Sequence, residues 1–169
     1  AYDREENKAA KDAIAQILIN SRMCAEGHRP ICQDTGIVNV FVEVGMDVKF
    51  DLTMSLDDAI NEGVRQGYLE NSNVLRASVL ADPAFGRKNT KDNTPAVIYH
   101  KLVPGNKVDI TVAAKGGGSE NKSKLAMLNP SDSIVDWELK TVPTMGAGWC
   151  PPGMLGIGIG GTAEKAMML

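Results

Sequence analysis

Several features are missing from this sequence, and their absence excludes several classes of function. No apolar run is long enough to cross a membrane, and the first residues lack the pattern of a signal peptide. Lysine and arginine form no run and the formal net charge is −3, so no broad positive surface is expected to bind nucleic acid. The count of three cysteines is odd for a disulfide scaffold. We expect a protein of the reducing cytoplasm, without a membrane or nucleic acid as partner.

Histidine is also scarce, which weakens the case for a zinc site. The sequence has two histidines, His28 and His100. A structural zinc ion needs four ligands, and Cys24 and Cys32 do not have a usual zinc spacing. His100 is expected in a strand, where it is more often packed or exposed than ligating. A catalytic Cys–His pair with Cys32 or Cys150 stays open, although nothing in the sequence places a histidine beside either thiol.

What is present is typical of one globular domain. The 169 residues are 43% hydrophobic and 23% charged, enough for a single core. The chain begins without methionine and ends at Leu169 inside an expected helix with no stop signal. We therefore expect residues 1–169 to be part of a larger protein.

The first half of the chain predicts two helices and a strand. Residues 4–20 have helical spacing, residues 21–35 are polar and irregular, and residues 37–44 form a strand with alternate valines on one face. Ser55 and Asp58 have the spacing of a capping box that begins a second helix. That helix carries a stripe of Ile60, Val64 and Tyr68, residues 73–83 are expected to add a helical turn or two, and residues 84–94 form a loop.

The second half predicts two further strands. Residues 96–103 and 107–115 alternate around a short Pro-Gly-Asn turn, which favours an antiparallel hairpin. Residues 132–140 predict a helix with Ser131 as its N-cap, and a terminal helix follows residues 160–162. Because helices and strands mix without a βαβ period, the fold class is α+β (mixed α/β), with amphipathic helices packed on a mixed or antiparallel sheet.

Two cysteines, Cys32 and Cys150, lie in segments that suit a metal ligand. Cys32 is followed by Gln33, Asp34 and Thr35, so a soft metal ligand lies beside a carboxylate able to take part in proton transfer. The alternative is a turn with a buried cysteine. Cys150 lies in "GWCPPG", where two prolines cannot join a ladder and hold the loop in a fixed shape that suits a metal ligand. The alternative there is a surface turn with an incidental thiol.

Two glycine-rich segments are candidates for binding anions. "KGGGSEN", from Lys115, can form a nest of backbone N–H groups for a carboxylate or phosphate, or act as a flexible hinge. Gly156, Gly158 and Gly161 fit the spacing of a dinucleotide fingerprint, but no βαβ unit precedes them. We interpret these three glycines as places of close approach rather than as a nucleotide site.

Four motifs together, "ICQDTG", "AKGGGSENKS", "GWCPPG" and "GIGIGGTAEKA", resemble the class I fumarate hydratases, a family of iron–sulfur hydro-lyases that includes the L-tartrate dehydratases. The resemblance covers nearly the whole chain. It implies that residues 1–169 are the first part of the family's N-terminal, cluster-binding catalytic domain, and that the remainder of this domain and a second domain lie outside the chain. It implies a [4Fe–4S] cluster held by three cysteines. Cys32 and Cys150 match two of these ligands, the third is expected beyond Leu169, and Cys24 matches none.

The resemblance also assigns roles to other residues. It implies that Gln33 and Asp34 face the substrate, with Asp34 assisting a base from outside the chain. Gly116 and Gly117 would offer N–H groups to a substrate carboxylate, and Arg76 is the candidate to pair with a carboxylate. The leading hypothesis is reversible hydration of fumarate to malate, in a homodimer, with residues 1–169 alone inactive. The alternatives are L-tartrate dehydration, a non-catalytic iron–sulfur redox sensor and a nucleotide-binding protein.

Overall fold

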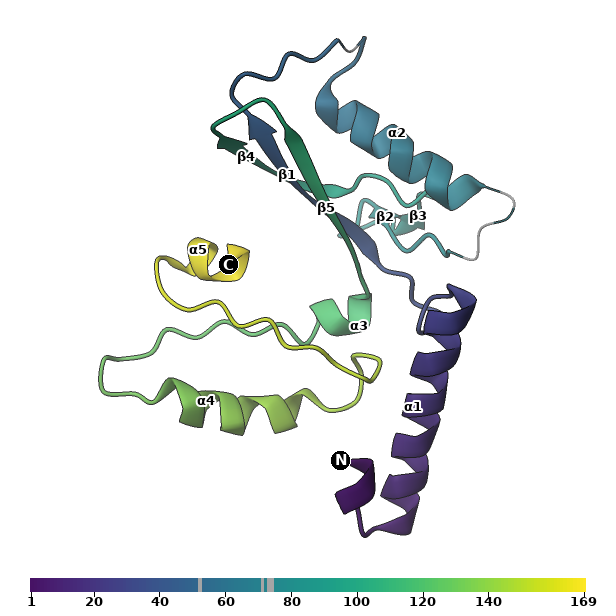
Figure 1. Cartoon of the computed structure of the whole chain (residues 1–169), viewed down its shortest axis with the longest axis vertical. Helices are drawn as coiled ribbons and strands as arrows, with labels where there is room; N and C mark the ends of the chain where they lie inside the picture. The colour runs from purple at the N-terminus through teal and green to yellow at the C-terminus, as the bar shows by residue number, and fades with distance from the viewer. Residues whose placement is uncertain (52, 71, 73–74) are drawn as a thin grey trace. The chain divides into compact units, whose positions relative to one another are not determined.

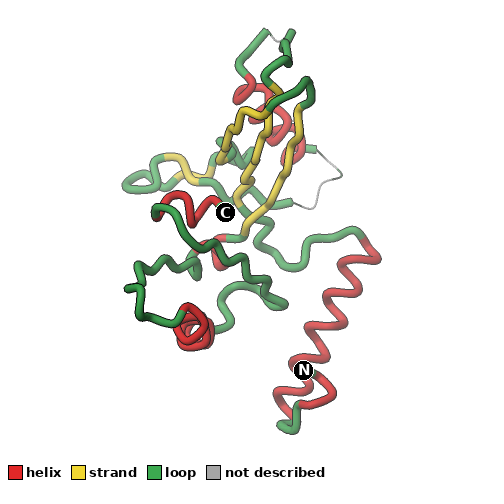
Figure 2. The backbone as a smooth tube through the Cα atoms, turned by 60° about the vertical axis from the view of Figure 1, so that its left-hand side comes forward, coloured by secondary structure: helices red, strands yellow, loops and turns green. Residues whose placement is uncertain are grey.

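The computed structural model describes residues 1–51, 53–70, 72 and 75–169. The chain divides into two compact units, which are described separately (Figure 1). One comprises Cys32–Gly117 and is called the strand unit here. The other, the terminal unit, comprises Ala1–Ile31 and Gly118–Leu169. Helices and a mixed sheet are both present, which confirms the predicted α+β class (Figure 2).

A three-stranded sheet organises the strand unit, and β1 (Ile37–Gly45) is its central strand. β4 (Val97–Val103) pairs with β1 in parallel, and β5 (Val108–Lys115) pairs with it antiparallel. The predicted hairpin is therefore wrong, because β1 lies between the two strands that were expected to pair. β1 carries the buried face, so both of its edges must find hydrogen-bond partners, and β4 and β5 supply one each.

The connection from β4 to β5 passes over the end of β1. Gly45 N–H donates to Lys107 O at 2.8 Å, and Met46 N–H donates to Val103 O at 2.9 Å. The Pro-Gly-Asn segment is thus a turn, as predicted, but it spans the width of an intervening strand. A Cβ at Gly45 would collide with Gly105 O, so the close crossing requires glycine at this position.

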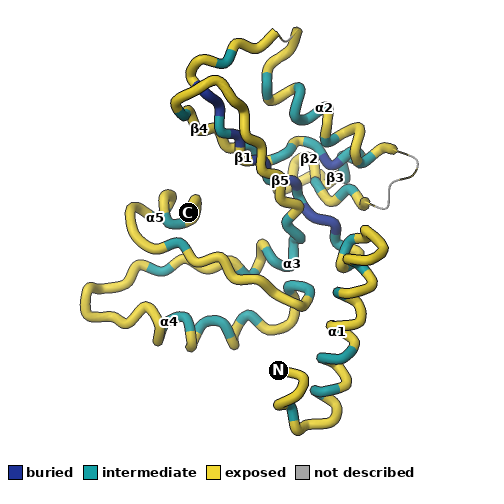
Figure 3. Tube along the Cα trace, viewed as in Figure 1, coloured by how far each residue is buried: buried dark blue, intermediate teal, exposed yellow. Residues whose placement is uncertain are grey.

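The core of the strand unit lies between the sheet and α2 (Leu56–Leu69). Ser55 caps this helix, and its Oγ accepts from Asp58 N–H at 3.1 Å, which confirms the predicted start. The helix packs its predicted stripe, Ile60, Val64 and Tyr68, against the sheet. The predicted alternation of β1 is also confirmed, and its buried hydrophobic residues are Val38, Val40, Val42 and Val44 (Figure 3).

The segment 75–83 is not helical, contrary to the prediction, and residues 73–74 lie outside the described residues. Residues 75–79 have no regular structure, and β2 (Leu80–Ala81) then pairs with β3 (Lys88–Asn89). Side chains account for this, because Thr35, Asn89 and Asn93 bind the backbone groups that a helix would have paired internally.

The terminal unit begins with a short 3-10 helix, Tyr2–Arg4, followed by α1 (Lys8–Gly27). α1 begins and ends later than predicted, and residues 21–27 are helical rather than irregular. Asn7 caps its start and accepts from Ala10 N–H at 3.1 Å. The polar residues beyond 20 continue the helix because Arg22 pairs with Glu26 one turn on, and the helix ends where His28 adopts a left-handed conformation.

The rest of the terminal unit is mostly loop with short helices. α3 (Gly117–Glu120) follows β5, and α4 (Ile134–Thr141) leads into a 3-10 helix, Val142–Met145. Ser133 caps α4, not Ser131 as predicted, because Ser133 Oγ accepts from Asp136 N–H at 3.2 Å. The predicted terminal helix is confirmed as α5 (Ala163–Met168). Within the described part of the chain, no helix is long and apolar enough to span a membrane.

Candidate functional site

The loop that leads into β1 holds the carboxylate of Asp34 in a fixed orientation. Asp34 Oδ1 accepts from Gly36 N–H at 3.1 Å, and Oδ2 accepts from Gly117 N–H at 2.8 Å. One side chain therefore joins the start of β1 to the glycine-rich segment after β5. A Cβ at Gly116 would lie 3.2 Å from Asp34 Oδ2, so glycine there leaves room for the carboxylate.

Arg76 lies beside the same loop through a reciprocal pair of hydrogen bonds. Arg76 N–H donates to Thr35 Oγ1 at 2.7 Å, and that hydroxyl donates to Arg76 O at 2.9 Å. The guanidinium Nη1 donates to Gln33 O at 3.5 Å. The buried Thr35 thus fixes the backbone of Arg76 against the residues that precede β1.

Four of the predicted site residues surround one cavity of about 300 Å³ in the strand unit. Its volume lies at the small end of the range typical for small-molecule sites. An arginine, a carboxylate and a side-chain amide on its wall provide groups for binding and orienting a small polar anion. The cavity is lined by Gln33, Asp34, Ile37, Arg76, Ala77, Ser78 and Gly117.

Two further residues support this cavity and were not predicted to be site residues. Asn93 is fully buried, and its side chain bonds to Ser78, Val79 and Gly36. Tyr68 Oη lies 3.3 Å from Thr35 O, to which it donates. Burial raises the pKa of Tyr68, so its phenol stays neutral and able to donate. Tyr68 was predicted as a core residue. Asn93 lay in a segment that was predicted to be a polar loop, and no sequence pattern marked it as a buried or functional residue.

The two predicted cluster ligands lie in different units. Cys32, in the strand unit, is half-buried, and its thiol donates to Asp34 O at 3.5 Å. Cys150, in the terminal unit, is also half-buried, and neither residue forms a disulfide. Cys24 lies in the last turns of α1, with its thiol 3.3 Å from Pro30 O.

The loop around Cys150 is held by the glycine-rich segment. Cys150 has a φ of 52° and precedes two prolines joined by a cis bond. Ser119 Oγ donates to Trp149 O at 3.3 Å, and a Cβ at Gly118 would collide with Gly148 O. The third glycine of "KGGGSEN" is therefore required by contact with "GWCPPG", two motifs that the sequence presented separately.

The donor chemistry of this chain suits an iron–sulfur cluster in part. Cys32 and Cys150 are thiols on irregular loops, which is the ligand type that such clusters take. Across residues 1–51, 53–70, 72 and 75–169, no group of three or more His, Cys, Asp or Glu residues that could hold a metal ion is found. The described part of the chain thus offers two fitting donors and assembles no set of three.

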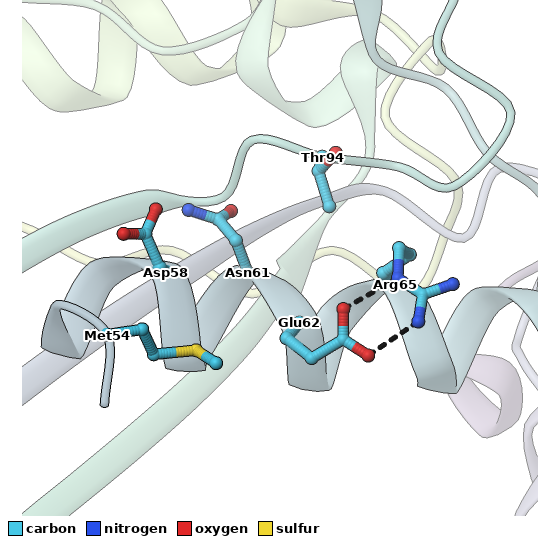
Figure 4. A pocket seen from close by; sticks show the side chains of 6 residues that line it. All are labelled: Met54, Asp58, Asn61, Glu62, Arg65 and Thr94. Carbon is cyan, nitrogen blue, oxygen red and sulfur yellow. Dashed lines mark hydrogen bonds and ion pairs between the residues drawn. The ribbon is translucent and has the colours of Figure 1, made fainter. Parts of the chain in front are cut away.

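A second hollow, about 380 Å³, lies along α2 and is lined by none of the predicted site residues (Figure 4). Glu62 and Arg65 form an ion pair on its wall. The hydrogen bond from Arg65 lowers the pKa of Glu62 to about 2. Because this charge is already compensated, the hollow is a weaker candidate than the one beside Asp34.

Comparisons with known proteins assign this chain to one family. The family described as fumarate hydratase (fumerase) matches residues 1–169. A putative L(+)-tartrate dehydratase subunit alpha of Methanocaldococcus jannaschii is 35% identical, over 100% of this chain and 61% of that protein. An anaerobic class I fumarate hydratase of Escherichia coli is 32% identical, over 97% of this chain and 30% of that protein.

A further relative, the L(+)-tartrate dehydratase subunit alpha of Escherichia coli O157:H7, is 27% identical over 99% of the chain and 55% of its own length. The chain thus spans less than two thirds of the length of these relatives. The family match extends from the first residue to the last, through all four motifs. The chain belongs to the fumarate hydratase family.

Proposed function

We propose that the protein containing this chain is an iron–sulfur hydro-lyase that reversibly hydrates fumarate to L-malate. The observation that carries the proposal is the single cavity that brings together Gln33, Asp34, Arg76 and Gly117. Family membership supports the same chemistry, because the matched relatives are named as fumarate hydratase and tartrate dehydratase subunits.

The cavity suits a small dicarboxylate. The guanidinium of Arg76 offers two parallel N–H donors, a fork that matches one carboxylate group. The amide of Gln33, which is exposed and lines the same cavity, can bind a second polar group of the substrate. With these groups around one cavity, the substrate is oriented before any bond changes.

Asp34 is the residue that we assign to proton chemistry. Its carboxylate is held by two backbone N–H groups, so it cannot swing away from the cavity. We propose that Asp34 assists a base supplied from outside residues 1–169, which removes or returns the C–H proton next to the reacting carbon. The family resemblance assigned the N–H groups of both Gly116 and Gly117 to a substrate carboxylate. Gly117 N–H instead donates to Asp34 Oδ2 and aligns it, so Gly116 N–H is the donor that we propose for the substrate.

Cys32 and Cys150 are the residues that would hold a [4Fe–4S] cluster, with a third ligand from outside the chain. When bound, such a cluster supplies a Lewis-acidic iron for the departing or entering hydroxyl. The chain itself provides substrate binding, orientation and part of the proton path.

The experiment uses the intact protein that contains this chain, reconstituted with iron and sulfide without oxygen. We expect cluster absorbance and turnover of malate, both lost in air. Asp34→Asn keeps the cluster and lowers kcat about a hundredfold or more, the usual loss for an acid/base group. Full activity in Asp34→Asn, or no cluster in the wild type, would overturn the proposal.

L-tartrate is the second candidate substrate. It is favoured by the relative from Methanocaldococcus jannaschii, of which the chain covers 61%, against 30% of the class I fumarate hydratase. Parallel assays with malate, fumarate and L-tartrate decide between them by kcat/KM. A cluster that forms without turnover on any of these acids would instead support a redox sensor.

The proposed function is accompanied by a proposal for the oligomeric state and the cellular compartment of the protein. We propose a homodimer in the cytoplasm, and size-exclusion chromatography of the reconstituted protein tests the dimer. A monomeric mass would contradict it. Titration with NAD is the test of the nucleotide-binding alternative, and we expect no binding.

A further inference from the structure

The cavity beside Asp34 has two walls that are far apart in the sequence. Gln33 and Asp34 of the loop 33–36 form the first, and Arg76, Ala77 and Ser78 of the segment 76–79, which has no regular structure, form the second. The lining is completed by Ile37 and Gly117. Thr35, which follows Asp34 in the chain, bonds to Arg76 at a sequence separation of 41 residues. Because these two segments lie outside the helices and strands, side-chain hydrogen bonds contribute to their separation.

Asn93 belongs to neither wall, yet its side chain holds both. Asn93 Oδ1 accepts from Ser78 N–H at 2.6 Å and from Val79 N–H at 3.2 Å. Its Nδ2 donates to Gly36 O at 3.0 Å. The side chain is 0% exposed, so water cannot replace these bonds if they are removed.

The backbone of Asn93 is adapted to this position. Its φ is 61°, in the left-handed region that asparagine tolerates better than most residues. That conformation lets one short amide reach two N–H groups on one wall and a carbonyl on the other. A longer or branched side chain could not adopt this backbone conformation and also form the same three hydrogen bonds.

We propose that Asn93 is a positioning residue that sets the separation between Arg76 and the Gln33–Asp34 pair, and so the fit of a dicarboxylate substrate. The inference rests on the proposed function, since it takes Arg76 as the carboxylate partner. A small displacement of a binding group weakens both substrate binding and the alignment for reaction.

Two variants of the intact, reconstituted protein test this role. Asn93→Gly removes all three bonds and keeps the left-handed backbone without strain. Asn93→Asp retains the acceptor for Ser78 and Val79 and loses the donor to Gly36. Asn61→Ala is the matched control, because Asn61 Oδ1 accepts from Ala96 N–H at 2.8 Å, a bond that touches neither wall.

We expect Asn93→Gly to raise KM for the dicarboxylate about tenfold or more, with cluster absorbance unchanged. Asn93→Asp gives an intermediate KM, and Asn61→Ala leaves KM within about twofold. In an Arg76→Ala background, Asn93→Gly adds little to KM, because the group that it positions is already gone. Equal effects in both backgrounds would show a merely structural role and overturn the inference.

Amide hydrogen exchange gives a readout that needs no turnover. We expect the amides of Ser78 and Val79 to lose protection in Asn93→Gly and to keep it in Asn61→Ala. Retained protection overturns the inference while the proposed function stands. A wild type that neither turns over nor binds succinate, or an Arg76→Ala variant with unchanged KM, overturns the proposed function and this inference with it.

Discussion

At the scale of single residues, the site depends on polar side chains that bind backbone groups. Asp34, Thr35 and Asn93 together tie the loop 33–36 to segments more than forty residues further along the chain. Each lost bond leaves a poorly hydrated backbone group unpaired, which costs about 1–3 kcal/mol. Substitutions here therefore affect both the shape of the cavity and the free energy of unfolding.

Tyr68 gives a pH-dependent test at this scale. Burial raises the pKa of its phenol above the ordinary value of 10.0. As pH rises through that ordinary value, the unfolded chain releases the proton while the folded chain retains it, so the free energy of unfolding falls. We expect the stability advantage of the wild type over Tyr68→Phe to shrink as pH rises above about 10.

Urea unfolding of both proteins between about pH 8 and pH 11 measures this difference. The comparison with Tyr68→Phe removes the contributions of lysines, cysteines and other tyrosines, which titrate in both proteins. An advantage that stays constant or grows with pH would show that the phenol is not kept neutral by burial.

The sequence showed part of the site at this scale. Gln33, Asp34, Arg76 and Gly117 were predicted together and do line one cavity, although their chemical roles remain predictions. Asn93 was missed because its bonds go to backbone atoms of distant residues, which leave no periodic pattern. Gly118 was expected in an anion-binding nest, but its close contact with Gly148 gives it a packing role.

At the scale of the element, β1 shows how burial depends on what covers a strand. Val40 and Val112 are direct partners across the β1–β5 ladder and share one face of the sheet. Val40 is 2% exposed, whereas Val112 is 62% exposed. The residues that pack on this face, among them Ile60 and Val64 of α2, cover β1 more fully than β5.

This pair gives a matched prediction. Val40→Ala removes two buried methyl groups and lowers the free energy of unfolding by about 2 kcal/mol, with a further cost for the cavity. Val112→Ala changes it by less than about 0.5 kcal/mol. Urea titration of both variants measures the difference, and equal losses would show that β5 is as well covered as β1.

Elements with a local signal were predicted, and elements defined by distant partners were not. β1 and α2 follow from valine alternation and from a capping box, both local features. The pairing of β4 and β5 was mispredicted because their turn is compatible with a hairpin, while the intervening strand comes from more than fifty residues earlier in the chain. α1 was predicted too short because its last turns are polar.

At the scale of the whole molecule, the described hydrophobic core belongs to the strand unit. The buried valines all lie in β1, while the described helices of the terminal unit contain no buried residue. Large apolar side chains are exposed in both units, including Phe85 at 87% and Met154 at 93%. Protection from exchange should therefore be uneven along the chain.

We expect hydrogen exchange followed by mass spectrometry to find the slowest amides in β1. Peptides from 142–162 should exchange fastest, since they have little regular structure and few buried contacts. Protection in 142–162 equal to that of β1 would contradict this distribution. Binding of a cluster to Cys150 should raise protection selectively around "GWCPPG", which the reconstituted protein can show in the same measurement.

The position of β1 between β4 and β5 has a consequence for the order of folding. β4 and β5 are separated by four residues, Pro104 to Lys107, so their ends meet soon after collapse, whereas β1 arrives from far along the chain. If β4 and β5 paired first as a simple hairpin, they would occupy the edges that β1 needs. Such a pair must open before the native sheet forms, so we expect a mispaired hairpin to slow folding. Docking of α2 on β1 before β4 and β5 pair would avoid this delay.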